Sequence, residues 1–192
     1  MDTYAAVCGR RTIRKFTDRP IPRELIGRIL NAARLSPSGI NRQALRFYAV
    51  VSKPLLDKIF PHTRYGGYLP DGSCSPTPAE APTAIVLILC DRSIAPSDDV
   101  AAGAAAQSMM LTAYSEGVGS CWMGAIDREE ILRICSLENE NLSLHTLISL
   151  GYPAMESRAV PIEQSGDVKY YFGKDGVLQV PKRSLEDVTK IL

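Results

Sequence analysis

A cluster of cations lies near the start of the chain. Arg10, Arg11, Arg14 and Lys15 fall within six consecutive positions of the stretch GRRTIRKF, and Arg19 follows shortly after them. Arginine presents a planar fork of N–H donors that matches the oxygens of a phosphate or carboxylate group. The cluster is therefore either a phosphate or polyanion site or, as most charge runs are, a solvated surface.

A second stretch combines residues that direct the backbone with side chains that form hydrogen bonds. It reads SPSGINRQ, and Pro37 and Gly39 set its backbone conformation. Its hydroxyl and amide side chains belong to Ser36, Ser38, Asn41 and Gln43. A tight turn would explain Pro, Ser, Gly and Asn at these positions. A polar ligand held against the end of the preceding helix would explain them equally well.

The glycine-containing stretch GVGSCWMGAI covers residues 117–126. It is not a dinucleotide-binding fingerprint, because its G-x-G lacks the following G-x-x-G spacing and does not open a first β–α unit. Its glycines indicate tight turns or a close backbone approach. Cys121 could serve as a nucleophile, but His62 and His145 are the only histidines and neither lies in a recognisable motif. A buried, unreactive thiol is the favoured interpretation.

A second basic segment, VPKRSLED, places Lys182 and Arg183 just before a predicted helix N-terminus. Such an arrangement suits an anion, although an exposed tail would look the same. The 192 residues contain no Walker loop, H-E-x-x-H, G-x-S-x-G or EF-hand pattern. Proteolysis, phosphoryl transfer and metal-dependent hydrolysis therefore have no support in the sequence.

The composition is that of a globular chain with balanced charge. Hydrophobic residues make up 45%, and 22 Lys and Arg against 21 Asp and Glu give a net charge of +1. Because nucleic-acid-binding proteins usually carry a basic excess, this balance disfavours a small interaction protein that uses its basic N-terminal cluster on nucleic acid. The five cysteines form no C-x-x-C pair, so they predict free thiols and neither a disulfide framework nor a zinc site.

The sequence also predicts where the protein resides. Its first residues, MDTYAAVCGRRT, lack the apolar core of a signal peptide. The longest apolar run, AIVLILC, is far too short to cross a bilayer. We therefore expect a cytoplasmic protein that has no membrane partner.

Hydrophobic periodicity and capping residues predict the elements that position these groups. Helices are expected over 22–35, 52–60, 98–117 and 127–135. Strands are expected over 45–51, 83–90 and 143–153. Gly117 should follow its helix as the C′ residue, and the segment 61–83, rich in Gly, Pro and Ser, should be a long loop.

The C-terminal residues 156–183 show little regular pattern and scattered charges. A last helix is expected in SLEDVTKIL, which begins with an S-x-x-D cap. An irregular tail of this length does not belong inside a compact domain. We therefore expect a single domain over 1–192 whose C-terminal extension, 156–192, wraps a partner subunit.

Three motifs in this order resemble the nitroreductase family of flavoenzymes: RRTIRKF, AARLSPSGINRQALRFYAV and GAAAQSMMLTAYSEGVGSCWMGAI. The family patterns are R-R-S-x-R-x-F, A-A-x-x-A-P-S-x-x-N-x-Q-P-W-x-F and G-x-G-S-C-W-x-G. The resemblance covers nearly the whole chain and is weakest over 61–80. It implies an α+β fold with a mixed β-sheet flanked by helices. It also implies an intertwined homodimer that holds two FMN molecules at its interface, each touched by both chains.

The resemblance implies two cationic contacts with FMN. At positions that match the first motif, FMN would be held by Arg10, Arg11, Thr12 and Arg14. The first cations would face the phosphate, and Arg14 would face the N1/O2 edge of the flavin ring. The ending of the chain resembles that of shorter members of the family, and its matching basic residues at the phosphate are Lys182 and Arg183.

Two further contacts are implied by matching positions. The partner chain would lay Pro37, Ser38 and Gly39 against the flavin, with Asn41 and Gln43 as supports. The backbone around Met123, Gly124 and Ala125 would approach the ring, with the Gly124 N–H near N5. The chain departs from the family where Ala44 and Leu45 replace Pro and Trp, which changes the local shape of the pocket.

These assignments imply an enzyme that transfers hydride. Charge develops at N1 and O2 of a reduced flavin, and a fixed cation there raises its reduction potential. By resemblance, NAD(P)H would reduce FMN in a ping-pong cycle, and nitroaromatic or quinone-type acceptors would reoxidise it. The alternative is other flavin chemistry, such as reductive dehalogenation, enoate-type reduction or flavin fragmentation.

Overall fold

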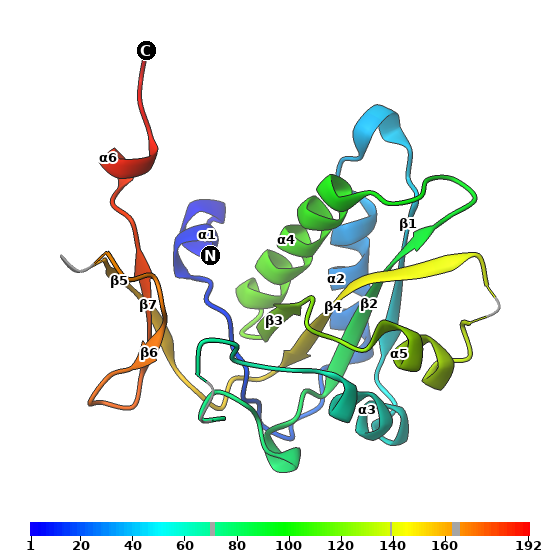
Figure 1. Cartoon of the computed structure of the whole chain (residues 1–192), viewed down its shortest axis with the longest axis horizontal. Coiled ribbons are helices and arrows are strands. Elements are labelled where there is room, and N and C mark those ends of the chain that lie inside the picture. The colour runs from blue at the N-terminus through cyan, green and yellow to red at the C-terminus, as the bar shows by residue number, and fades with distance from the viewer. Residues whose placement is uncertain (70–71, 139, 163–165) are drawn as a thin grey trace.

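A four-stranded sheet lies at the centre of the computed structural model, which describes residues 1–69, 72–138, 140–162 and 166–192 (Figure 1). Its strand order is β1-β2-β4-β3, from β1 (Leu45–Val50), β2 (Ala84–Asp91), β4 (Leu142–Gly151) and β3 (Gly119–Met123). All three pairings within it are antiparallel. The middle strands are buried along almost their whole length, as is typical of strands covered on both faces.

Helices cover both faces of this sheet. On one face lie α2 (Arg23–Arg34) and α4 (Asp99–Ser115), and on the other lie α3 (Lys53–Ile59) and α5 (Arg128–Ile134). The short α1 (Thr3–Gly9) packs against α4. Together these elements form a three-layer arrangement, so the predicted α+β class is confirmed, while the intertwined dimer and the wrapping tail stay predictions.

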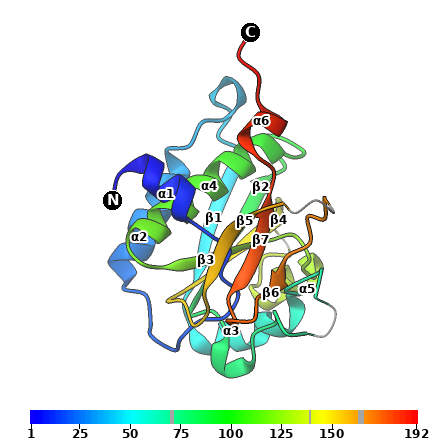
Figure 2. The ribbon, with the colours of Figure 1, turned by 90° about the vertical axis from the view of Figure 1, so that its left-hand side faces the viewer.

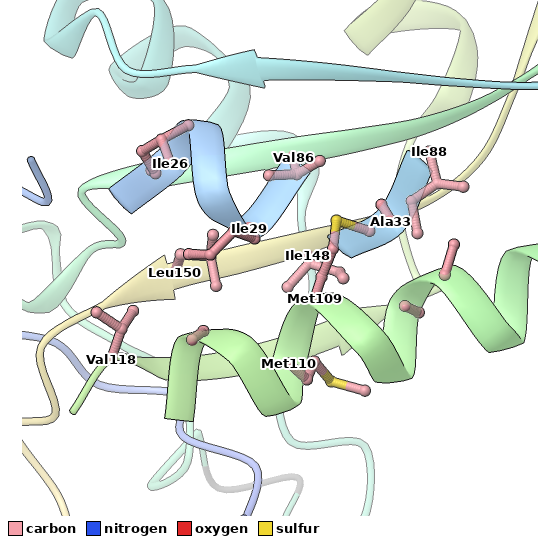
Figure 3. Packing of buried hydrophobic residues seen from close by; sticks show 14 of the residues in the cluster. Ile26, Ile29, Ala33, Val86, Ile88, Met109, Met110, Val118, Ile148 and Leu150 are labelled. Atoms are coloured by element: carbon pink, nitrogen blue, oxygen red, sulfur yellow. The ribbon is translucent and has the colours of Figure 1, made fainter. Parts of the chain in front are cut away.

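The alternation of side chains along each strand divides the core into two halves. Toward α2 and α4 point Val86, Ile88, Ile148 and Leu150. Figure 3 shows them meeting Ile29 of α2 and Met109 of α4, both fully buried. Toward α3 and α5 point Ile85, Leu87, Leu89 and Leu147. None of the helices in the described part of the chain has the length and apolar character needed to cross a bilayer.

Most of the predicted elements are present. The helices correspond to α2, α3, α4 and α5, and the strands correspond to β1, β2 and β4. Gly117 has a φ of 75° and follows α4 as its C′ residue, as predicted. The predicted loop over 61–83 is interrupted by the short 3-10 helices η2 (Phe60–His62) and η3 (Pro78–Glu80), and its residues 70–71 lie outside the described part. Neither α1 nor β3 was predicted.

The prediction of an irregular tail over 156–183 was wrong. The described part of this segment contains β5 (Ser157–Pro161), β6 (Tyr171–Phe172) and β7 (Leu178–Lys182). They form a second sheet of order β5-β7-β6, in which β5 and β7 are parallel. Leu178 and Gln179 are buried there. Residues 163–165 lie outside the described residues.

The end of the chain projects away from both sheets. The last helix, α6 (Leu185–Val188), begins with a capping box between Ser184 and Asp187, as predicted. Figures 1 and 2 show the small sheet beside the N-terminal segment, with α6 and the C-terminus beyond it. Ile191 and Leu192 are fully exposed.

The N-terminal arm that follows α1 lies along the edge strand β3. Thr12 forms a parallel bridge with Ser120, and the Ile13 N–H donates to the Ser120 carbonyl at 2.9 Å. A Cβ on Gly119 would meet the Cβ of Ile13 at only 2.9 Å. The close approach predicted from the glycines therefore occurs here. In the described residues, the parallel pairings are this bridge and the β5–β7 pair, and the other strand pairs are antiparallel.

Candidate functional site

Arg14 lies where the N-terminal arm meets the C-terminal extension. Its backbone N–H donates to the Sδ of Met155 at 3.4 Å. Its guanidinium lies over the ring of Tyr170, with 4.6 Å from Cζ to the ring centroid. The Tyr170 hydroxyl accepts a hydrogen bond from the Tyr68 N–H at 3.2 Å, and the two rings pack 5.3 Å apart. The arm, the segment 61–69 and the extension thus converge on one cation.

Two guanidinium groups of the arm keep buried donors that the described residues do not use. Arg10 Nε and Arg14 Nη1 are buried and have no hydrogen-bond partner among the described residues. Burial, and then the charge of Arg11, lower the pKa of Arg10. Arg11 differs, because its guanidinium donates to the carbonyls of Cys8 and Arg10. Since buried donors are nearly always paired in folded proteins, Arg10 and Arg14 point to an acceptor that the described residues do not supply.

The end of β3 forms a short exposed turn. Met123 is the buried last residue of the strand, and Gly124 and Ala125 are exposed. The Gly124 carbonyl accepts hydrogen bonds from the Ile126 N–H at 3.1 Å and from Arg128 Nη2 at 3.2 Å. This turn lines a hollow of about 430 Å³ together with Pro61, His62, Arg64 and Asp127.

Gly124 is not required by the packing of its own chain. Its φ lies outside the left-handed region, and an added Cβ would meet only the Cγ2 of Thr146, at 3.9 Å. Gly119 in the same strand is different, because Ile13 occupies the space beside it. The missing side chain at Gly124 therefore leaves room for a group from outside the chain.

Cys121 lies in β3 between the arm and the core. It is buried, and burial raises the pKa of its thiol to about 11, although the charge of Arg14 acts in the opposite direction. A thiol with such a pKa is almost entirely protonated at neutral pH. The structure agrees with the interpretation of Cys121 as unreactive.

The turn that connects α2 with β1 has its own structural hydrogen bonds. The Ser36 hydroxyl donates to the Ser108 hydroxyl of α4 at 2.8 Å, and the Ser38 hydroxyl accepts from the Gln43 N–H at 3.1 Å. Asn41 and Gln43 have positive φ values of 55° and 53°. Turn formation thus accounts for Ser36 and Ser38. Four other predicted site residues of this turn are exposed: Pro37, Gly39, Asn41 and Gln43.

One chain does not bring all the predicted residues together. Figures 1 and 2 show the connection between α2 and β1 well apart from the arm that follows α1. Lys182 and Arg183 are exposed where β7 ends and α6 begins. The structure therefore places residues 10–14 of the arm beside β3. The placement of residues 37–43 at the same site stays a prediction that needs a second chain.

Sequence reasoning missed Tyr68, Tyr170 and Arg128. Both tyrosines lie in segments without a clear pattern, and their link to Arg14 appears only when three distant segments meet. Arg128 is one basic residue in the first turn of a helix, and its acceptors are the carbonyls of Gly124 and His145. Backbone acceptors leave no signal in the sequence.

Comparisons with known proteins agree with the resemblance seen in the motifs. Residues 7–152 match the sequence profile of the nitroreductase family. The chain is 36% identical, over 80% of its length and 78% of the relative, to a Methanothermobacter thermautotrophicus protein provisionally named NADH dehydrogenase/NAD(P)H nitroreductase. A relative with the same provisional name from Archaeoglobus fulgidus is 33% identical over 77% of this chain and 83% of its own.

A solved structure is also similar. It is a provisionally named nitroreductase from Desulfovibrio desulfuricans, crystallised in complex with FMN. The match has a TM-score of 0.64 and 29% identity, and covers 86% of this chain and 94% of that one.

Proposed function

Because the chain belongs to the nitroreductase family, we propose that it binds FMN and uses NAD(P)H to reduce nitroaromatic or quinone-type acceptors. The observation that carries the proposal is the pair of buried guanidinium donors, Arg10 Nε and Arg14 Nη1, that lack partners among the described residues. FMN offers acceptors of the required kinds, namely a phosphate group and the N1/O2 edge of its ring. Supporting this choice, the Desulfovibrio relative was crystallised with FMN.

The charges of the arm fit a phosphate group. Arg10 is held close to Arg11, and both burial and this neighbour disfavour its charged form. An anion would reverse both effects, since hydrogen bonds between guanidinium and phosphate are charge-assisted. Arg10 and Arg11 are therefore assigned to the phosphate, with Thr12 beside them on the arm. Lys182 and Arg183, which are exposed, would supply the second cationic contact.

Arg14 is assigned to the ring. It lies farther along the arm, beside β3, and the turn at Gly124 closes the same strand. FMN, when bound, supplies hydride transfer to and from its ring. Arg14 would hold positive charge at the N1/O2 edge, and the Gly124 N–H would be directed at N5, with Met123 and Ala125 on either side. In this assignment the protein binds and orients the flavin, and no side chain acts as an acid or a base.

The second half of the site would come from a partner chain. Pro37, Ser38, Gly39, Asn41 and Gln43 are assigned to the flavin of a second subunit. Their turn carries Ile40 at 90% exposure, an apolar side chain that would gain free energy if a partner surface covered it. In such a dimer the nicotinamide and the acceptor would use one pocket in turn, which is a ping-pong order.

The test begins with the purified protein. We expect a yellow protein that releases FMN, and no FAD, on denaturation, at one FMN for each chain. Mass analysis of the supernatant distinguishes the two flavins. Mixing with NADH or NADPH in the absence of acceptor should bleach the yellow colour of the flavin. Adding a nitroaromatic compound or a quinone should restore this colour. A chain that takes up no FMN after reconstitution would rule the proposal out.

A further inference from the structure

We infer that Arg128 is a positioning residue, which holds the turn at Gly124 and Ala125 in the orientation needed by the flavin ring. This inference rests on the proposed function, because it concerns the turn that is assigned to the ring. No motif identified Arg128 in the sequence, and its role follows from the way its guanidinium joins the ends of two strands.

The guanidinium of Arg128 bridges β3 and β4 at the point where their pairing stops. The last pair of the ladder is Met123 with Leu147. If the ladder continued in register, Ala125 would pair with His145. Instead, Arg128 donates from Nε and Nη2 to the His145 carbonyl at 3.2 and 3.0 Å, and from Nη2 to the Gly124 carbonyl at 3.2 Å. Arg128 therefore satisfies the His145 carbonyl beyond the end of the ladder, while the Ala125 carbonyl accepts from the Arg64 N–H at 3.0 Å.

The two ends of this bridge are themselves held in place. Arg128 opens α5, whose cap Asp127 accepts a hydrogen bond from the Glu130 N–H at 3.1 Å and donates its own N–H to the His62 carbonyl at 3.0 Å. On β4, the ring of His145 lies 3.0 Å from Asp99 at the start of α4. A donor anchored on α5 thus meets an acceptor on β4, and the turn lies between these two anchored elements.

The charge of Arg128 has no other evident use. It forms no ion pair with any described residue, whereas Arg133 on the same helix is paired with Glu130. Water could satisfy the N–H groups of a surface arginine at little cost in free energy. Here its planar fork makes three N–H···O contacts with backbone carbonyls, and such contacts fix direction as well as distance. One of these carbonyls, that of Gly124, belongs to the turn that is assigned to the flavin, and the other, that of His145, belongs to β4 beside it.

The position of the turn would affect the two redox states differently. The Gly124 N–H should donate better to N5 of the oxidised flavin than to N5 of the reduced one, because N5 itself carries hydrogen after two-electron reduction and is then a poorer acceptor. Loosening the turn should therefore weaken the binding of oxidised FMN more than that of reduced FMN. The two-electron reduction potential of the bound FMN should then rise. Loss of the cation at Arg14 should instead lower this potential.

The experiment compares Arg128→Ala and Arg128→Lys with Arg133→Ala, a matched control on the same helix. For Arg128→Ala we expect oxidised FMN to bind about threefold to tenfold more weakly, as for the loss of one hydrogen bond. The two-electron potential should rise by roughly 15–30 mV, since tenfold corresponds to about 30 mV. Arg128→Lys should fall between wild type and Arg128→Ala, and Arg133→Ala should match wild type.

A second measurement does not depend on flavin. In the protein without FMN, the Ile126 amide, which donates to the Gly124 carbonyl, should exchange its hydrogen about threefold to tenfold faster in Arg128→Ala than in Arg133→Ala. Equal exchange in these two variants would overturn the inference. So would faster exchange with an unchanged potential in FMN-loaded protein. If wild type bound no FMN, the proposed function would fail, and the exchange data would still decide whether Arg128 holds the turn.

Discussion

The guanidinium of Arg14 lies over the ring of Tyr170, with 4.6 Å from Cζ to the ring centroid, although 155 residues separate them in the chain. The contact ties the N-terminal arm to the C-terminal extension. Such contacts contribute about 0.5–1 kcal/mol at exposed sites and more when they are desolvated. Tyr170 covers one side of Arg14, while the buried Nη1 keeps a donor that no described residue accepts. Arg14 is therefore oriented before any ligand arrives.

The first prediction concerns the reduction potential. In Arg14→Ala, the reduced flavin should lose a charge-assisted contact worth about 1.5–3 kcal/mol. If the whole loss falls on the reduced state, the two-electron potential should drop by roughly 30–65 mV. A redox titration of FMN-loaded wild type and variant measures this shift. Arg14→Lys should recover part of it, because lysine keeps the charge and loses the planar fork.

Arg10→Ala provides the contrast. The phosphate charge does not change with the redox state of the ring, so this variant should bind both states more weakly and leave the potential as in wild type. An unchanged potential in Arg14→Ala, with FMN still bound, would show that Arg14 does not face the N1/O2 edge.

The second prediction separates folding from binding at Gly124. An alanine there meets only the Cγ2 of Thr146 at 3.9 Å, so the free energy of unfolding in urea should stay within about 0.5 kcal/mol of wild type, as for most surface changes. FMN binding should nevertheless weaken by at least about tenfold, because the added methyl group lies where the ring must approach. Fluorescence titration with FMN measures the loss.

Two glycine controls accompany this variant. Gly27→Ala, at an exposed helix position with free space around its Cβ, should leave FMN binding unchanged. Gly119→Ala should instead destabilise the fold by about 1–3 kcal/mol, because its Cβ would meet Ile13 at 2.9 Å. Full FMN affinity in Gly124→Ala would place the ring elsewhere.

The third prediction concerns stability at alkaline pH. Burial raises the pKa of Cys121 to about 11, from an ordinary value of 9.0. Between these values the unfolded chain has lost a proton that the folded chain keeps, so the free energy of unfolding falls as the pH rises. At about 1.4 kcal/mol for each pKa unit, the loss from this thiol should reach about 2–3 kcal/mol.

The test follows urea unfolding from about pH 8 to about pH 11. Burial also raises the pKa of Tyr65, so wild type should lose stability from more than one group. Over this pH range the free energy of unfolding should fall less in Cys121→Ala than in wild type, whatever the stability of the variant at about pH 8. Identical pH dependence in Cys121→Ala and wild type would contradict the assignment.

The elements that the sequence predicted correctly are those whose signal is local. The eight residues of β2 are apolar almost throughout, and α2 places its buried side chains at helical spacing. In contrast, β3 lies in a glycine-rich stretch and is a strand because β4 and the arm pair with it. The strands of the extension are short, and β6 has only two residues. Their pairing depends on distant segments, which local propensity does not record.

The candidate site divides in the same way. The arginines of the arm stand out as a charge cluster, and their roles and that of the turn at Gly124 follow from the match to family motifs. Tyr170 and Arg128 were not named, since each acts on a group that is distant in sequence or on a backbone carbonyl. The side chains that would touch a ligand were thus accessible from sequence, and those that hold them in place required coordinates.

The last prediction concerns assembly, and it starts from the apolar end of the chain. Leu185 and Val188 of α6 are 69% and 61% exposed, and Ile191 and Leu192 are fully exposed. Burying a side chain of this kind is worth about 1.5–3 kcal/mol, so such a run suits a partner surface better than water.

We expect an obligate homodimer with an interface larger than the usual 1,600 Å² or so, and deletion of 157–192 should abolish FMN binding. In sedimentation experiments, Leu185→Asp with Val188→Asp should raise the dimer dissociation constant at least about tenfold, whereas Lys190→Glu on the same segment should have little effect. A stable wild-type monomer that carries FMN would show that one chain completes the site by itself.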